Sequence, residues 1–176
     1  AADDYHALAL DSGGKVYAWG GNGNGRLGNN STQDSSVPVA VNVSGVLAGK
    51  TVTAIAAGGE KSLALDSAGK VYAWGWNGNG QLGNNSTTES HVPVAVDVSG
   101  VLAGKTVIAI AAGDFHSLAL TSEGKVYAWG GTDPSDNLGQ LGNNSTAGSL
   151  VPVAVDVSGV LAGKTIIAIA AGAYHS

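Results

Sequence analysis

The chain repeats itself with a period of 55 residues, and this repeat limits its fold more than any other feature. The motif KVYAWG occurs three times and places its tryptophan at Trp19, Trp74 and Trp129. A second marker follows the same period except for a last step of 59, because four residues are inserted in the third copy; its positions are His6, Lys61, His116 and His175. A fixed period of this length indicates an array in which each copy is one supersecondary unit.

Each copy reads as four short strands. In the second copy the runs TVTAIAA (51–57), SLAL (62–65), KVYAW (70–74) and VPVAVDV (92–98) are apolar or β-branched, and Gly, Asn, Asp and Ser separate them. None of the runs has the period of a helix. The sequence therefore predicts an all-β fold built from four-stranded antiparallel sheets.

Three details favour a β-propeller among all-β folds. KVYAW is apolar at successive positions, which indicates a strand buried on both faces, as when small sheets stack. The run TVTAIAA carries small residues, which suit an inner strand near a narrow axis. Proline cannot donate to a ladder and belongs on an edge strand, and it occurs once in each VPVAV run, at Pro38, Pro93 and Pro152. These features are typical of propeller blades; a β-solenoid is the alternative, although its coils are usually shorter.

The number of copies and the two ends of the chain predict an incomplete ring. We expect one partial propeller array over residues 1–176, with repeats at 7–61, 62–116 and 117–175 and three four-stranded antiparallel blades. Ala1-Ala2 is the tail of an inner strand that the first blade lacks, and residues 165–171 form an extra inner strand at the C-terminus. Propellers close with about 4–8 blades. The chain is therefore expected to be a fragment of a longer protein, or to associate head to tail through its blade edges, with two chains giving a six-bladed ring.

Composition and motifs argue against several classes of function. The net charge is −5 with eight Lys and Arg and no basic run, which excludes the footprint of a nucleic-acid binder. No apolar stretch is long enough to span a membrane. We find no set of catalytic residues, no metal-ligand pattern and no cofactor motif, so we predict a non-enzymatic module for protein binding or structural assembly. The abundance of Ala, Gly, Asn, Ser, Thr and Val favours a bacterial protein that is extracellular or at the cell surface.

The first two copies differ at twelve positions, and nine of these fall in two connections that should emerge on one face of the ring. The connections are the turn after the inner strand and the long loop after Trp-Gly, which also holds the insertion. Aromatic residues and Arg are frequent anchors of interfaces. We therefore predict a partner-binding face that comprises Tyr5, Arg26, Trp76, His91, Phe115, Asp133 and Tyr174. The alternative is that these loops vary because they carry little packing load.

The recurring polar and aromatic residues have a structural interpretation as well. His6, His116 and His175 share one position of the repeat and would lie on different blades, so we expect them to form hydrogen bonds rather than to bind a metal. The tryptophan of each KVYAWG motif is expected to pack between blades, with carbohydrate stacking as the alternative.

The order of motifs resembles the regulator of chromosome condensation repeat family, in its bacterial form. The matching segments are Gly58–Leu65 and Gly113–Leu120, then KVYAWG, then Gly80–Gly83 and Gly139–Gly142 (GQLG), then VPV. The resemblance implies a propeller. It also raises two alternatives: a guanine-nucleotide exchange factor for a small GTPase, and a protein inhibitor of an enzyme such as a β-lactamase. None of the residues with which the family's exchange factor acts can be placed on this sequence.

Overall fold

The strands form three antiparallel sheets, one for each expected blade. The computed structural model describes residues 1–135 and 137–176, and these contain eleven β-strands and no helix. The first blade comprises β1 (His6–Leu10), β2 (Val16–Gly20) and β3 (Ser35–Ala40). The second comprises β4 (Val52–Gly58), β5 (Lys61–Asp66), β6 (Val71–Gly75) and β7 (Ser90–Ala95). The third comprises β8 (Val107–Ala112), β9 (His116–Thr121), β10 (Val126–Gly130) and β11 (Ser149–Ala154).

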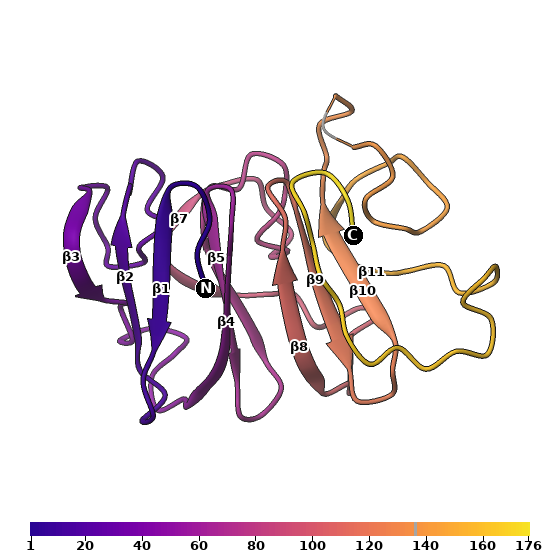
Figure 1. The fold of residues 1–176 in the computed structure, drawn as a ribbon, viewed down its shortest axis with the longest axis horizontal. Helices are drawn as coiled ribbons and strands as arrows, with labels where there is room; N and C mark the ends of the chain where they lie inside the picture. Colours follow the sequence, from indigo (N-terminus) through magenta and orange to yellow (C-terminus); the bar gives the residue numbers. More distant parts are fainter. Residues whose placement is uncertain (136) are drawn as a thin grey trace.

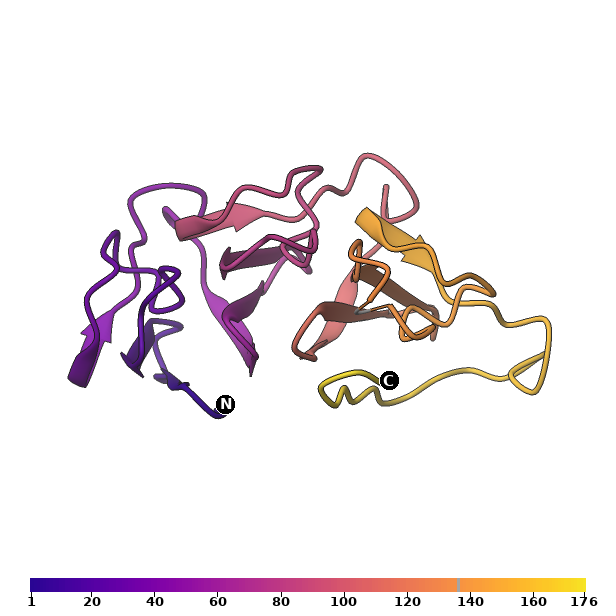
Figure 2. The same cartoon turned by 90° about the horizontal axis from the view of Figure 1, so that it is seen from above.

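The blades stand side by side along an arc (Figures 1 and 2). The strand order in the second and third sheets is β4-β5-β6-β7 and β8-β9-β10-β11. Seen from above, β4 and β8 lie on the concave side of the arc, and β3, β7 and β11 on its convex side. The outermost strands carry Pro38, Pro93 and Pro152, as expected for residues that cannot complete a ladder. The prediction of an incomplete β-propeller is confirmed.

Local sequence signals close each hairpin between the second and third strands of a blade. In the second blade, Asp66 Oδ1 accepts hydrogen bonds from the backbone N–H groups of Ala68 and Lys70, both at 2.9 Å. The turn ends on Gly69, whose φ of 75° is unfavourable for other residues. The hydroxyl of Tyr72 donates to Asp66 Oδ2 at 2.9 Å, and this bond ties the turn to β6.

The core lies between the blades rather than within them. One cluster is formed by residues of the first blade, such as Leu8 and Leu27, together with Tyr72 and Trp74 of the second. An equivalent cluster joins the second and third blades around Trp129. Both tryptophans are completely buried. The second blade packs against a neighbour on both sides, so β5 and β6 are buried at every position. This explains why KVYAW lacks an apolar–polar alternation.

The two ends of the chain occupy equivalent places in the array. Ala2 forms an isolated antiparallel bridge with Ala7, and Leu8 N–H donates to the carbonyl of Ala1 at 2.8 Å, so Ala1-Ala2 is the end of an inner strand. Residues 165–171 follow the inner-strand path, since Ile166 N–H donates to Gly124 O at 3.2 Å as Val107 does to Gly69. This segment packs against the third blade but has no ladder, because no strand of the described chain pairs with it.

Candidate protein-binding surface

The two variable connections lie at the same end of the blades, the upper end in Figure 1. One residue of each copy lies in the turn after the inner strand, directly before the His or Lys position of the repeat. The three blades contribute Tyr5, Glu60 and Phe115, and the C-terminal segment contributes Tyr174. The long loop that follows the second hairpin adds Trp76 from the second blade. We call these five residues together with Arg26 the axial patch.

Aromatic rings connect the second blade to the third and then to the C-terminal segment. The rings of Trp76 and Phe115 meet edge to face, with centroids 6.0 Å apart and an interplanar angle of 78°. The ring of Phe115 also packs on Tyr174, with a centroid distance of 5.2 Å. Such arrangements are favourable for aromatic pairs. The three side chains therefore form a continuous aromatic surface, although their residues lie far apart in the sequence.

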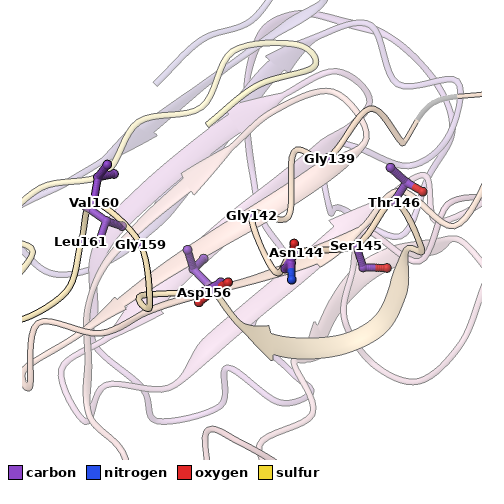
Figure 3. A pocket seen from close by; sticks show the side chains of 10 residues that line it. Gly139, Gly142, Asn144, Ser145, Thr146, Asp156, Gly159, Val160 and Leu161 are labelled. Carbon is purple, nitrogen blue, oxygen red and sulfur yellow. The ribbon is translucent and has the colours of Figure 1, made fainter.

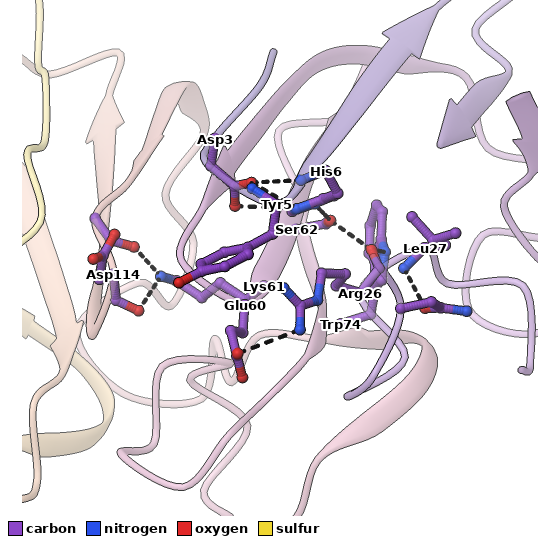
Figure 4. A network of polar contacts seen from close by, with 12 residues as sticks. Asp3, Tyr5, His6, Arg26, Leu27, Glu60, Lys61, Ser62, Trp74 and Asp114 are labelled. Atoms are coloured by element: carbon purple, nitrogen blue, oxygen red, sulfur yellow. Dashed lines mark hydrogen bonds and ion pairs between the residues drawn. The ribbon is translucent and has the colours of Figure 1, made fainter. Parts of the chain in front are cut away.

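A charged pair occupies the side of the patch nearest the first blade (Figure 4). The guanidinium carbon of Arg26 lies 5.2 Å from the centroid of the Tyr5 ring, a cation–π distance. Arg26 Nη2 lies 3.3 Å from Glu60 Oε1, and Asn24 Nδ2 donates to the other carboxylate oxygen. The Arg26 side chain is only 7% exposed. Burial of this guanidinium requires the carboxylate and the ring, because an unpaired buried charge is costly.

A small cavity opens in the middle of the patch. Its volume is about 220 Å³, and its lining residues are Tyr5, Gly59, Glu60, Trp76, Asp114 and Phe115. Gly59 and Asp114 hold the same position of the repeat, one residue before Glu60 and Phe115. Pockets for small molecules typically have volumes of about 300–1,000 Å³. The cavity therefore has the size of one inserted side chain rather than that of a cofactor.

Lys61 lies beneath the patch at the position where the other copies carry histidine. The side chain is fully buried, and its ammonium group donates to the carbonyls of Gly113 and Asp114. Burial lowers the pKa of Lys61 to about 7, although the carboxylates of Asp114 and Asp3 act in the opposite direction. Burial also raises the pKa of Asp114; Lys61 opposes this rise, whereas Asp4 and Asp3 add to it. Carboxylates thus accumulate at this end of the blades.

His6 and His116 form hydrogen bonds to the next unit of the array, in agreement with their expected structural role. His6 Nε2 lies 2.7 Å from Ser62 Oγ, and that hydroxyl donates to the carbonyl of Arg26 at 2.8 Å. His116 contacts Ser176 in the same way at 3.0 Å. The Ser176 hydroxyl donates to Gln140 O at 2.8 Å, so His116 Nε2 is the donor to Ser176, and His116 Nδ1 has no partner among the described residues. Its pKa falls to about 4, because of burial first and then because of Lys61 and His175.

Two of the predicted site residues lie apart from the axial patch. His91 contacts Glu89 at 3.1 Å and packs beside Gly25 of the first blade. Asp133 is exposed in the insertion, where it accepts hydrogen bonds from Ser135, and the neighbouring Asp136 lies outside the described residues. Sequence reasoning omitted Glu60 and Asp114 from the site. Both occupy variable positions of the repeat, so the comparison of copies carried the signal that could have found them.

A second candidate surface is the exposed side of the third blade. Trp74 and Trp129 each insert over a glycine of the preceding blade, since a Cβ added to Gly28 or Gly83 would lie within 2.6 Å of an indole nitrogen. Their indole N–H groups donate to the carbonyls of Arg26 and Gln81, at 2.8 and 3.0 Å. These contacts define a tryptophan socket in the first blade and another in the second.

The corresponding socket of the third blade holds no indole. A Cβ added to Gly142 would meet only Val155, at 3.3 Å. A cavity of about 290 Å³ is lined here by Gln140, Leu141 and Gly142. It adjoins an open hollow of about 910 Å³ that shares Gly142, Val155 and Leu161 with it (Figure 3). At the other end of the array, Trp19 is partly exposed, and its indole N–H has no acceptor among the described residues.

Neither a metal site nor a membrane-spanning helix is found among the described residues. Residues 1–135 and 137–176 contain no group of three or more His, Asp or Glu side chains that could hold a metal ion. The same residues contain no helix of the length and apolarity needed to cross a membrane.

Comparison with known proteins identifies the repeat. The sequence model of the "Regulator of chromosome condensation (RCC1) repeat" matches residues 13–65 and 68–120, which is more than half of the chain. A second model of the same description matches residues 52–81 and 107–140. Both matches agree with the resemblance that the motifs indicated.

Relatives and solved structures extend the match over nearly the whole chain. The chain is 35% identical over 157 residues to human "E3 ubiquitin-protein ligase HERC2", a match that covers 88% of this chain and 3% of the ligase. It is 34% identical over 152 residues to "Ultraviolet-B receptor UVR8" of Arabidopsis thaliana, covering 86% of this chain and 32% of the receptor. The crystal structure of Prp20p from Saccharomyces cerevisiae superposes with a TM-score of 0.80 at 22% identity, over 97% of this chain and 40% of Prp20p. The chain thus spans less than half the length of each of these proteins.

Proposed function

Because the chain belongs to the regulator of chromosome condensation repeat family, we propose that it serves as a non-enzymatic propeller module that binds a protein partner through the axial patch. The observation that carries the proposal is the convergence of Trp76, Phe115 and Tyr174 in ring contact on one end of the blades. These residues come from variable positions of an otherwise regular repeat, so they are not needed to build a blade.

The chemistry of the patch supports a protein partner. Interface hot spots are enriched in Trp, Tyr and Arg and surround small pockets that bury an anchor from the partner. Tyr5 is 58% exposed and Tyr174 is 45% exposed, so aromatic area is available for contact. Prp20p, whose fold is similar, has binding properties to Gsp1p and histones, and this precedent for protein partners adds to the proposal.

The test is a comparison of variants in one binding assay. A partner captured with the immobilised chain is identified, purified and titrated against the chain by calorimetry. We expect the double variant Trp76→Ala/Phe115→Ala to weaken binding at least tenfold, since hot-spot truncations cost about 2 kcal/mol or more. The control is Asp133→Asn, which changes an exposed residue outside the patch. Equal affinities of the double variant and the unchanged chain would refute the proposal.

We also propose head-to-tail association of two copies, because the tryptophan socket of the third blade and Trp19 of the first blade complement each other. Trp19 of one copy would enter over Gly142 of the other and donate to the carbonyl of Gln140, as Trp74 and Trp129 do within the chain. The segment 165–171 would then pair with β1 of the second copy. For this pairing either residues 1–7 of one copy or residues 170–176 of the other must be displaced, because the two segments hold the same positions of the repeat.

Solution mass decides on association. The chain has a mass of 17.3 kDa, so light scattering coupled to size exclusion distinguishes one copy from two. We expect a dimer that Trp19→Ala converts to a monomer, while Trp76→Ala, a matched loss of an indole on a different surface, leaves the dimer intact. A monomer for the unchanged chain at all concentrations would exclude the proposal.

Two further activities follow from the resemblance of the repeats. Guanine-nucleotide exchange on a small GTPase and inhibition of a β-lactamase would each be tested by direct assay. A bacterial origin and an extracellular or cell-surface location rest on composition alone.

A further inference from the structure

We propose that the cavity of the axial patch receives a cationic side chain, Arg or Lys, from a basic segment of a partner protein. The inference rests on the proposed function and specifies which group of a partner would insert. It follows from the walls of the cavity, the charges around it and a cation that the chain itself already holds beside it.

The walls combine aromatic faces with carboxylates. Tyr5, Trp76 and Phe115 contribute rings, and Glu60 and Asp114 contribute the charged groups. An ammonium or guanidinium group is attracted to the face of an aromatic ring and gains further from a nearby carboxylate. An apolar anchor would leave the carboxylates desolvated and without a counter-ion, which is costly.

Arg26 shows that this arrangement holds a cation. Its guanidinium lies over the Tyr5 ring and against Glu60 on one side of the patch, and it is nearly buried there. On the other side, Trp76, Phe115 and Asp114 provide a second set of rings with a carboxylate. The Asp114 carboxylate accepts no hydrogen bond within the described residues. The cation that interacts with this second set is Lys61, which lies beneath the patch and donates to backbone carbonyls rather than to the carboxylate.

The charge balance also favours a cation. Asp3, Asp4, Glu60 and Asp114 bring four carboxylates to these turns. Asp3 lies 3.0 Å from His6 and Glu60 lies 3.3 Å from Arg26, whereas the cation that interacts with Asp114 is Lys61. Lys61 is bound to backbone carbonyls, and its pKa of about 7 leaves it only partly charged at neutral pH. Burial raises the pKa of Asp114, and Asp4 and Asp3 add to this rise while Lys61 opposes it, so a further cation beside this carboxylate would offset part of the cost of its burial.

The cavity does not suit the other cations that carboxylates attract. Within the described residues no three acidic or His side chains gather as metal ligands. A volume of about 220 Å³ is below the usual range for small-molecule sites. A single long side chain, whose stem lies along the rings and whose charge reaches the carboxylates, matches both the size and the chemistry.

The experiment titrates the whole chain with three capped tripeptides, Gly-Arg-Gly, Gly-Lys-Gly and Gly-citrulline-Gly, and follows the indole N–H signals by NMR. Citrulline has the shape of Arg without its charge. We expect the Arg peptide, the Lys peptide or both to shift the Trp76 signal in a saturable way, and the citrulline peptide to bind at least tenfold more weakly. Trp129 serves as the internal reference, because its indole N–H is buried and bonded to Gln81 O.

Three variants locate the site. Asp114→Asn should weaken binding of the charged peptides roughly two- to fivefold, and Phe115→Leu roughly three- to tenfold. The equivalent positions hold Gly59 and Glu60 in one copy and Ala173 and Tyr174 at the C-terminal end, so the blade accepts different side chains there. Asp133→Asn is the matched loss of a carboxylate outside the cavity and should bind as the unchanged chain does.

Each other outcome overturns the inference. Equal binding of the citrulline peptide would show that charge is irrelevant, and equal effects of Asp114→Asn and Asp133→Asn would show only a diffuse attraction to an acidic chain. Absence of any shift at Trp76 would exclude the cavity. If a partner protein depends on Trp76 and Phe115 but the peptides do not bind, the proposed function stands and the cationic anchor is refuted. If the charged peptides bind at Trp76 but no partner protein does, the cationic site stands and the proposed function is refuted.

Discussion

His6 lies 2.7 Å from Ser62 across the boundary between the first and second blades. The Ser62 hydroxyl donates to the carbonyl of Arg26, and the indole of Trp74 donates to the same oxygen at 2.8 Å. These four groups form an inter-blade hydrogen-bond chain. His116, Ser176 and Gln140 repeat part of it at the far side of the third blade. This series of hydrogen bonds joins two blades that no strand ladder connects, so it fixes the orientation of one sheet relative to the next.

Removal of the hydroxyl from this chain should loosen the first two blades. We expect Ser62→Ala to lower the free energy of unfolding by about 1 kcal/mol, because His6 loses its buried partner while the carbonyl of Arg26 keeps the indole of Trp74. The first copy carries Ala7 at this position, so the side chain itself is compatible with the blade. Urea unfolding of both proteins measures the difference. The control is Ser44→Ala, whose hydroxyl is exposed; equal midpoints for the two variants would contradict the role of Ser62.

The buried Lys61 should make stability increase with pH above neutrality. Its pKa is about 7 in the folded chain and 10.5 in the unfolded chain, so the unfolded chain binds more protons between these values. The free energy of unfolding should therefore rise by roughly 2 kcal/mol from pH 7 to pH 9. Lys61→His, which restores the residue of the other copies, should remove most of this rise. The exposed Lys125→His is the control, and an unchanged pH dependence in Lys61→His would refute the assignment.

The buried His116 should make the stability of the fold decrease as the pH falls below neutrality. The folded chain holds its pKa at about 4, below the ordinary value of 6.5, so stability is lost as pH falls through this window. His116→Gln removes the titrating group and leaves a donor for Ser176. We expect the stability advantage of the unchanged chain over this variant to shrink by about 2 kcal/mol between pH 7 and pH 5, measured by urea unfolding. A difference that is the same at both pH values would show that His116 does not titrate in this range.

Two equivalent glycines should respond differently to the same substitution. Gly83 and Gly142 both have positive φ, 67° and 59°, so alanine strains the backbone at either position. Only at Gly83 does the added Cβ collide with a buried indole, that of Trp129. We expect Gly83→Ala to lower the thermal midpoint clearly more than Gly142→Ala does. The difference between the two midpoints measures the clash with the indole that fills the socket at Gly83. Equal losses would mean that backbone strain alone accounts for both.

The fold could be predicted largely because the repeat presents the same evidence three times. The positions of Pro38, Pro93 and Pro152 identified the outer strands, and the double-sided KVYAW run identified the buried ones. The ends of the chain were also predictable, since Ala1-Ala2 and residues 165–171 match parts of an inner strand. The missing ladder of the C-terminal segment was not, because a strand depends on its neighbour and not only on its own sequence.

The candidate site was predictable only in part. Comparison of the copies directed attention to Tyr5, Arg26, Trp76, Phe115 and Tyr174, which the fold does bring to one end of the blades. The same comparison could not separate them from His91 and Asp133, which vary for reasons outside the patch. A periodic pattern does not show in which direction a loop side chain points or how far it lies from the side chains of other loops.

By itself, the sequence determined the local structure and the order of the strands, because turn residues, prolines and apolar runs act on their immediate neighbours and recur with the period. The tertiary structure decided which residues meet. Arg26 faces Glu60, and Phe115 bridges Trp76 and Tyr174, because stacking the blades brings the loops of neighbouring blades next to each other. The empty socket at Gly142 beside the filled ones at Gly28 and Gly83 has the same origin. Identical sequences become different surfaces when a neighbouring blade is present on one side and absent on the other.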